Sequence, residues 1–405
     1  TRPRRSARRS PAAVAERTEH DMAAEHQDAP KVDDRPFIDA TSQARSRYGR
    51  FNLAIVGETG VGKSSLVNAV FGRDYAAVGK GLPVTSGVNY YHDESLGIWD
   101  FEGFEVGSAV SPAQSLRQHL ETVSRRPADE QIAVVWYCVL SQADRLTRFD
   151  IDRIRELDAR GLPVILVLTK VHWTRNTVTG RYSAPKDTSD FVDWLEHPVD
   201  EHGTPIHLPI RRVILTASHD EHGKGTGHGL GELVEATLEL SPRTEQDAFR
   251  IAQRLNLPWK REMARPIIAT GAAAAAAAAA VPIPVADAAA LAPIQMTMMG
   301  RIAAIYDLEM TTMLSTSALA QLGAQVTGQA LARSFIKLVP VAGSVINAAV
   351  ASAITAAAGE GWLRLCEQVH TGKVDPARVA DAVGQFRPSV VAVVTKMAVR
   401  RVSKR

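Results

Sequence analysis

The segment GETGVGKS at residues 57–64 constrains this chain more than any other feature of its sequence. It follows an apolar run at residues 51–57 and precedes a helical pattern at residues 64–71, so it joins a strand to a helix. Its three glycines let the backbone curl tightly, and the amides of such a turn add to the positive potential at the start of a helix. The segment therefore predicts a cradle for a phosphate group.

The same loop carries the side chains that a nucleoside triphosphate with Mg²⁺ requires. The Lys63 ammonium can reach the β- and γ-phosphate oxygens, and the Ser64 hydroxyl can ligate Mg²⁺. The segment fits G-x-x-x-x-G-K-[ST] at every position, and the flanking strand and helix disfavour a chance glycine-rich turn. We expect the whole segment to line the nucleotide, with Ser65 beside the α-phosphate: Gly57, Glu58, Thr59, Gly60, Val61, Gly62, Lys63, Ser64 and Ser65.

Beyond the loop, short apolar or β-branched runs alternate with amphipathic stretches, as in a parallel sheet covered by helices. Trp136 and Tyr137 lie in one of the apolar runs and are expected in the core. A polar, Gly- and Pro-containing connection at residues 175–209 is expected to hold a short helix at residues 190–196. The pattern predicts an α/β fold, a three-layer P-loop NTPase G domain, with strands at residues 51–57, 87–92, 96–101, 132–140, 163–169 and 212–216.

Two further segments fall where a nucleotide and its metal require them. Thr85 ends the segment LPVT in a connection between the first helix and the second strand, and its hydroxyl is expected on Mg²⁺. Asp100 and Gly103 fit D-x-x-G at the end of the third strand, where the Asp holds a Mg²⁺-bound water and the Gly contacts the γ-phosphate. The predicted catalytic set is Lys63, Thr85, Asp100 and Gly103, with Ser64, Thr85 and Asp100 at the metal.

The segment expected to read the base departs from the guanine pattern [NT]-K-x-D. Thr169 can brace the phosphate loop and the Lys170 stem can stack on the base, but His172 stands in place of the Asp. A neutral imidazole offers one acceptor where a carboxylate pairs with two N–H groups of guanine, so we expect weakened base discrimination. Ala217 and Ser218 follow the last strand and are expected beside the base. The alternative is that the base is read elsewhere.

Residues 50–240 carry these four motifs in an order that resembles translation-factor-related GTPases. GETGVGKSSLVNAVFG at residues 57–72 looks closest to the Era-like, septin-like and immunity-related branches. The resemblance implies GTP and GDP as ligands with Mg²⁺, bound by residues 59–65, Thr85, Asp100, Gly103, Thr169, Lys170 and Ala217. Phe104 stands where Ras-like enzymes carry the Gln that orients the attacking water, so hydrolysis is expected to be slow unless activated.

Two functions of different class follow from these residues. In the first, the protein is a GTPase switch that hydrolyses GTP with Mg²⁺ and acts on its C-terminal region. In the second, it is a nucleotide-dependent assembly scaffold with little hydrolysis and relaxed base specificity, which Phe104 and His172 favour. The expected partners are a guanine nucleotide, a second copy through the G domains and a membrane surface, with no nucleic acid.

After residue 240 the composition changes to an Ala-rich region with few charges between residues 267 and 359, including nine successive alanines at residues 272–280. Alanine has the strongest helix propensity, so we expect an all-α second domain. The segment at residues 266–307 is similar to a bacterial domain of unknown function that follows such GTPase domains, which implies a helical and membrane-associated effector module. Residues 267–286 and 337–358 are long enough to span a bilayer, but Pro282, Pro284 and Pro340 interrupt them. Their small residues also suit close helix packing in water, so a soluble helical bundle is favoured over peripheral membrane contact or a true span.

The charge balance, the cysteine count and the composition of the two ends predict the domain boundaries and the cellular location. The 47 Lys and Arg against 44 Asp and Glu leave little net field, and only two distant cysteines argue for a reducing compartment without disulfides. We expect a disordered basic tail at residues 1–46, the G domain at 47–240 and the helical domain at 241–405, ending in basic residues. The expected location is the cytoplasm, with peripheral or integral contact at the inner membrane through residues 264–360 left open. A loop holding His219, His222 and His228 is expected to be solvated.

Overall fold

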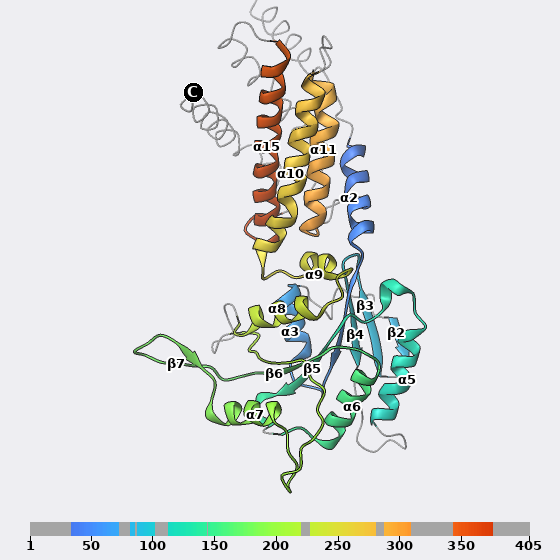
Figure 1. Ribbon diagram of the computed structural model, residues 1–405, viewed down its shortest axis with the longest axis vertical. Helices are drawn as coiled ribbons and strands as arrows, with labels where there is room; N and C mark the ends of the chain where they lie inside the picture. The colour runs from blue at the N-terminus through green and yellow to red at the C-terminus, as the bar shows by residue number, and fades with distance from the viewer. Residues whose placement is uncertain are drawn as a thin grey trace, which may run out of the picture.

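The computed structural model describes residues 34–72, 82–85, 87–101, 112–143, 145–219, 227–280, 287–308 and 343–375. These residues form two parts, a sheet flanked by helices and a bundle of long helices that stands on one end of it (Figure 1). The chain passes twice between the two parts, because the first described helix lies in the bundle although its sequence precedes the sheet.

One sheet of seven strands forms the centre of the first part, in the order β2-β3-β4-β1-β5-β6-β9. β1 is parallel to β4 and β5, and β6 and β9 continue the parallel set, whereas β2 and β3 are antiparallel at one edge. The predicted α/β fold is confirmed, and each of the six predicted strands is present. The strands are β1 Phe51–Val56, β2 Leu82–Thr85, β3 Val88–His92, β4 Leu96–Phe101, β5 Val134–Leu140, β6 Val164–Thr169 and β9 Arg212–Leu215.

The segment Leu82–Thr85 is a strand rather than the connection that the sequence pattern predicts. It pairs with β3 at the edge of the sheet, with Leu82 opposite Tyr90 and Thr85 opposite Val88. The segment is short and contains a proline, which lacks the N–H that a ladder needs and is confined to edge strands. Its pairing therefore depends on the exposed edge of β3, which lies outside the segment itself.

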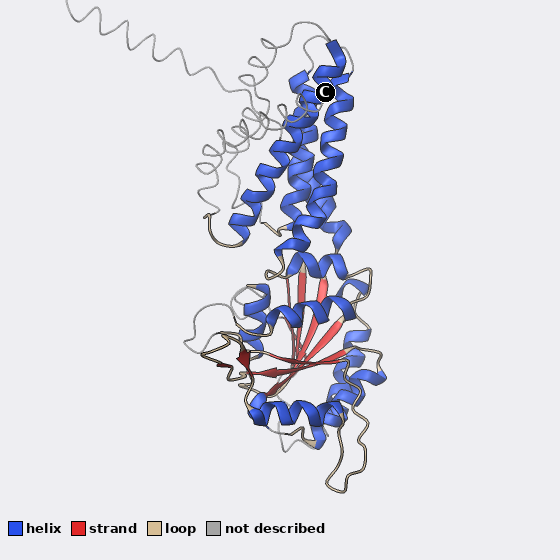
Figure 2. Cartoon of the chain, turned by 60° about the vertical axis from the view of Figure 1, so that its left-hand side comes forward, coloured by secondary structure: helices blue, strands red, loops and turns tan. Residues whose placement is uncertain are grey.

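Helices cover both faces of the sheet and bury two separate apolar cores. One face packs against α3 Lys63–Phe71, α8 Leu230–Leu240 and α9 Gln246–Ala252. The other packs against α5 Pro112–Ser124, α6 Arg148–Ala159 and α7 Lys186–Glu196. Short 3₁₀ turns lie at Ala128–Glu130 and Ser141–Ala143. The three-layer arrangement expected of a sheet buried on both faces is thus present (Figure 2).

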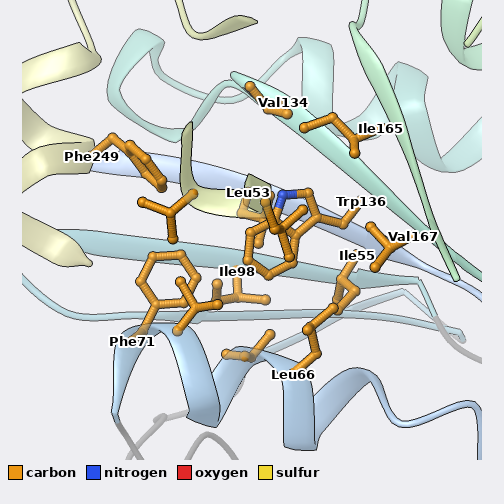
Figure 3. Close-up of a cluster of buried hydrophobic side chains, with 14 of the residues drawn as sticks. Leu53, Ile55, Leu66, Phe71, Ile98, Val134, Trp136, Ile165, Val167 and Phe249 are labelled. Atoms are coloured by element: carbon orange, nitrogen blue, oxygen red, sulfur yellow. The ribbon is translucent and has the colours of Figure 1, made fainter. Parts of the chain in front are cut away.

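Trp136 and Tyr137 show how one strand serves both cores. Trp136 stacks on Phe71 with ring centroids 5.8 Å apart and donates from Nε1 to Thr237 Oγ1 at 3.0 Å (Figure 3). Tyr137 points to the opposite face, where its hydroxyl donates to Asp150 Oδ1 at 2.7 Å. Both rings are fully buried, which confirms the prediction that they belong to the core.

The second part is a bundle of four long helices, which confirms the prediction of a helical C-terminal region. α10 packs against α15 and α11, and α11 packs against α2 (Figure 1). Glycines allow the close approach: a Cβ on Gly271 would lie 2.9 Å from Met298 Sδ, and one on Gly300 would lie 2.4 Å from Phe37 O. The helices are α2 Arg35–Tyr48, α10 Leu257–Ala280, α11 Asp287–Ile305 and α15 Gly343–His370.

The prediction of a disordered tail through residue 46 is wrong for Arg35–Tyr48, which form α2. This helix buries Phe37, whose ring forms a T-shaped pair with that of Trp362 with centroids 5.9 Å apart, and Thr41, whose hydroxyl donates to Gly300 O at 3.1 Å. The segment has too few apolar residues to fold alone, but α11 and α15 supply the missing apolar surface. Residues 1–33 lie outside the described part of the chain.

Within the described ranges, one helix is long and apolar enough to cross a membrane, namely α10, and a third of its apolar window is buried against the rest of the protein. This finding is weak evidence for a span, because core helices pass the same test. The two segments of sufficient length, residues 267–286 and 337–358, fall partly on residues that the structure does not describe. Cys138 and Cys366 are both buried thiols, as expected of a chain without disulfides.

Candidate functional site

The loop between β1 and α3 adopts a backbone path that only glycines take easily. Gly57, Gly60 and Gly62 have φ of +150°, +84° and +100°. Gly57 is also crowded, since a Cβ there would lie 2.5 Å from the carbonyl oxygen of Cys138 on β5. The geometry of the turn therefore requires the three glycines of the motif.

Lys63 begins α3 and folds back over this loop. Its side chain is buried, and Nζ donates to Gly57 O at 2.9 Å and to Glu58 O at 3.3 Å. These neutral carbonyls are weaker acceptors than phosphate oxygens, so an incoming phosphate can take over the ammonium. Glu58, Thr59, Ser64 and Ser65 are exposed around it, which leaves the mouth of the loop open to a ligand.

Asp100 lies on the strand beside the loop. It is buried on β4, opposite Ile55 of β1 and Asn89 of β3. Burial raises the pKa of the Cys138 thiol to about 12, with Lys63 opposing and Asp100 adding to the shift, so all three groups share one region of the sheet. Cys138 is thus an unreactive thiol beneath the phosphate loop.

The donors expected at a metal come to the same end of the β2-β3-β4 edge. Thr85 is opposite Val88, and Val88 is opposite Phe101, the residue after Asp100. Hydroxyl and carboxylate oxygens are the ligands that Mg²⁺ prefers, so this donor set fits that ion together with phosphate oxygens. Among the described residues, no group of three His, Cys, Asp or Glu side chains could hold a metal unaided. Gly103 and Phe104 lie outside the described residues.

The end of β6 touches the phosphate loop directly. Thr169 Oγ1 donates to Val61 O at 2.6 Å and to Val139 O at 3.2 Å, the bracing contact expected from the sequence. Lys170 has a positive φ of +54° and Nζ donates to Gly60 O at 2.7 Å. The positive φ turns the chain sharply after the strand, and the Lys170 stem then runs beside Gly62.

His172 and the segment after β9 are neighbours. The buried Val171 donates from its N–H to Thr216 O at 3.0 Å, and His172 is exposed next to it. The Ala217 N–H, one group expected to face a base, donates instead to His228 O at 3.0 Å. The predicted base site is therefore assembled from two segments that a main-chain hydrogen bond holds together, with one of its amides already engaged.

One prediction for this region is wrong. His228 belongs to a loop that we expected to be solvated, but its ring contacts Trp173 and Tyr182. The flanking glycines, Gly227 and Gly229, are the only sequence signal for this packing, since both approach the backbone of β9 and the residues after it too closely for a Cβ. His219 is exposed, and His222 falls on residues without a described position.

This fold and this loop match those of a P-loop GTPase G domain, and a helical region follows them in the chain. Residues 52–170 match the family model of the 50S ribosome-binding GTPase, and residues 243–387 match a domain of unknown function, DUF697. The probable GTP-binding protein EngB of Mycoplasmopsis agalactiae is 28% identical over 115 residues, which span 28% of this chain and 58% of that protein. The chain thus aligns with less than two thirds of that relative's length.

Several solved structures are also similar. Toc33 from Arabidopsis thaliana, in complex with Mg²⁺ and GMPPNP, is 16% identical with a TM-score of 0.31, covering 51% of this chain and 90% of its own. The FeoB G-domain from Methanococcus jannaschii is 16% identical with a TM-score of 0.24, covering 47% and 97%. An ADP-ribosylation-factor-like GTP-binding protein from Encephalitozoon cuniculi, in complex with GDP, is 11% identical with a TM-score of 0.29, covering 59% and 92%.

Proposed function

We propose that this protein binds GTP, hydrolyses it to GDP and phosphate with Mg²⁺, and acts as a nucleotide-dependent switch on its helical domain. The observation that carries the proposal is the buried Lys63 ammonium, held over a loop whose glycines alone permit its path. Thr169 and Lys170 reach the same loop from β6, so the phosphate and base segments meet. The name of the EngB relative, a probable GTP-binding protein, supports guanine as the base.

The proposed roles are those expected from the sequence motifs. Lys63 meets the β- and γ-phosphates, while Ser64 and Thr85 ligate Mg²⁺ and Asp100 holds a water on it. Gly103 contacts the γ-phosphate. The base lies between the β6 and β9 segments, and the proposed lining residues are Gly57, Glu58, Thr59, Gly60, Val61, Gly62, Ser64, Ser65, Thr169, Lys170, His172, Ala217 and Ser218. The Era-like, septin-like or immunity-related branch is part of the same proposal.

Turnover is proposed to be slow without an activator. Phe104 cannot orient a water molecule, so a residue from elsewhere has to complete the hydrolytic centre. A second copy docking through its G domain is one source of such a residue. The rate per protein molecule then rises with protein concentration, whereas a self-sufficient enzyme has a constant rate per molecule.

The switch proposal rests on contacts between the turn after β3 and the helical domain. Arg45 of α2 pairs with Glu94 and donates from Nη2 to Leu308 O at 2.9 Å. Ser95 Oγ donates to Asp307 Oδ2 at 3.0 Å. β4 starts directly after this turn and ends at the Mg²⁺-side carboxylate, so a single strand connects the helical domain to the proposed metal site.

A buried lysine adds a second connection at the same junction. Lys260 of α10 is fully buried, and its ammonium donates to Ile251 O at the end of α9 and to Ile305 O, 3.1 Å away, at the end of α11. Cations are stabilised at helix C-termini, so one side chain joins a helix packed on the sheet to a helix of the bundle. We propose domains at the expected bounds of 47–240 and 241–405, except that the whole of α2 belongs with the helical domain and α9 packs on the sheet of the G domain.

The second candidate is an assembly scaffold with relaxed base specificity. Two observations favour it: His172 is an exposed imidazole where guanine readers carry a carboxylate, and the Ala217 N–H is engaged by His228. A cytoplasmic location with contact to a membrane through residues 264–360 is compatible with either candidate, because α10 is apolar along much of its length.

Lys63→Ala tests the proposed site. We expect nucleotide binding to be lost and the unfolding temperature to be retained, because the variant removes the cation and leaves both cores intact. Lys186→Ala, on the exposed start of α7, is the matched control and should bind GTP normally. Undiminished GTP affinity of Lys63→Ala in calorimetric titrations contradicts the assignment. Phosphate release, measured with GTP and with ATP at low and high protein concentration, separates the two candidates. The switch releases phosphate from GTP in preference to ATP, whereas the scaffold releases little phosphate from either nucleotide.

A further inference from the structure

Three aromatic rings from separate segments meet beside the proposed base site. The rings of Tyr182 and His228 have centroids 4.4 Å apart, and those of Trp173 and His228 are 5.6 Å apart. Trp173 follows His172 directly, and His228 is paired with Ala217 through two main-chain hydrogen bonds. We call these three residues the aromatic cluster. It therefore spans the two segments between which a base is proposed to lie.

A small hairpin carries Tyr182, and Trp173 directly precedes it, so the hairpin brings both rings to His228. β7 Thr174–Arg175 pairs antiparallel with β8 Tyr182–Ser183, and together they project from the sheet (Figure 1). The turn is well defined, because the Asn176 side chain accepts from the amides of Val178 and Thr179 and Gly180 takes a φ of +68°. The hairpin begins two residues after His172, so any movement of the hairpin moves the β6 segment as well.

The backbone beneath His228 has little room to move. Gly227 and Gly229 pack so closely that a Cβ on either would lie within 2.0 Å of a carbonyl oxygen of Ala217 or Leu215. With the Ala217 pairing, these approaches fix the His228 backbone, from which the ring extends, relative to Ala217–Ser218. The rings of Trp173 and Tyr182, packed on a fixed partner, hold the segment Lys170–His172 at one distance from Ala217–Ser218.

We propose that the aromatic cluster is a positioning element for the nucleotide base, and that Tyr182 is a determinant of base selection. This inference rests on the proposed guanine-nucleotide site. The Val171 to Thr216 hydrogen bond joins the two base segments through their main chains, and the aromatic cluster joins them a second time through side chains. Such a second contact compensates for the missing carboxylate at position 172, because a base held in a pre-formed position needs less ordering to make the hydrogen bonds that distinguish guanine from adenine.

The test uses the full chain with Tyr182→Ala, which removes one ring. Tyr182 is half exposed, so the change leaves no buried cavity, and loss of its ring contact with His228 should lower the unfolding temperature only slightly. Tyr182→Phe keeps the ring, and Val178→Ala changes the tip of the same hairpin, where the side chain is 91% exposed. Both serve as matched controls. The ligands are GTP, GDP and ATP in calorimetric titrations, and pyrophosphate in competition.

We expect Tyr182→Ala to weaken GTP and GDP by the same factor, about three- to tenfold, which is the range that an aromatic pair contributes. The ratio of GTP affinity to ATP affinity falls. The affinity for pyrophosphate, measured by competition, is unchanged because that ligand has no base. Both control variants bind all four ligands as the wild type does. Two results overturn this inference and leave the proposed function standing. In the first, the wild type binds GTP and Tyr182→Ala binds it with the same affinity; in the second, the affinity for pyrophosphate falls by the same factor as that for GTP. A wild type that binds no guanine nucleotide overturns the proposed function as well.

Discussion

Gly57→Ala is the change for which the structure predicts the largest effect in the phosphate loop. Gly57 has a φ of +150°, and an added Cβ would lie 2.5 Å from the carbonyl oxygen of Cys138. That oxygen belongs to β5, a central strand bonded to neighbours on both sides, so it cannot move away cheaply. The variant has to shift the loop itself, and with it the position of Lys63.

Two costs set the magnitude. A residue other than glycine at a sparsely populated positive φ costs on the order of 1–3 kcal/mol. Forcing an extra methyl group into a packed site costs roughly another 1–3 kcal/mol. We therefore expect Gly57→Ala to lower the free energy of unfolding of the G domain by about 3 kcal/mol or more. Gly60→Ala is the matched control, because Gly60 has a φ of +84° but no atom within 4 Å of an added Cβ. It should cost about 1 kcal/mol, from backbone strain alone.

Denaturant unfolding of both variants measures the difference. The buried Trp99 and Trp136 report on the sheet, and the buried Trp362 and partly buried Trp259 report on the helical domain and its junction, so fluorescence and far-ultraviolet dichroism should be followed together. GTP affinity is expected to fall with Gly57→Ala because the loop and its lysine shift. Equal losses of stability in the two variants would refute the reasoning, since the crowding by Cys138 would then have no energetic effect.

Three further changes test the site and the junction. His172→Asp should raise the GTP to ATP affinity ratio about tenfold, as a charge-assisted hydrogen bond to guanine contributes about 1.5–3 kcal/mol; an unchanged ratio in calorimetry means that other groups read the base. Asp100→Asn should weaken Mg²⁺-dependent GTP binding more than GDP binding, and equal losses contradict its γ-side role. Burial raises the pKa of the Glu245 carboxyl from 4.5 to about 6, so ionising it costs stability as the pH rises through that window. Glu245→Gln should therefore raise the unfolding midpoint at pH 7.5 and not at pH 4, whereas a pH-independent difference argues against this cause.

Local pattern was sufficient for the sheet and for the phosphate loop. The four central strands, β1, β4, β5 and β6, were readable because residues buried on both faces form largely apolar runs. The loop was readable because each glycine and the lysine have a requirement that few other residues meet. The Thr169 contact with Val61 was expected for the same reason, since β6 lies two strands from β1 and ends at the loop.

Elements that depend on a distant partner were not readable. α2 has few apolar residues on its buried face and is polar elsewhere. Packing against α11 and α15 stabilises the helix. β2 exists because β3 offers an edge. The aromatic cluster joins residues 173, 182 and 228, whose contact depends on a hairpin two residues long on each side. No periodicity marks such a contact.

The sequence by itself determined the class of fold, the phosphate loop and the helical character of the C-terminal region, because these follow from backbone requirements and from apolar periodicity within a short window. Only the tertiary structure decided which side chains and amides around the site are already engaged. The Lys63 ammonium rests on Gly57 and Glu58, and the Ala217 N–H rests on His228. The physical reason is that a polar group shielded from water must find a partner, and the nearest one in space is often remote in sequence.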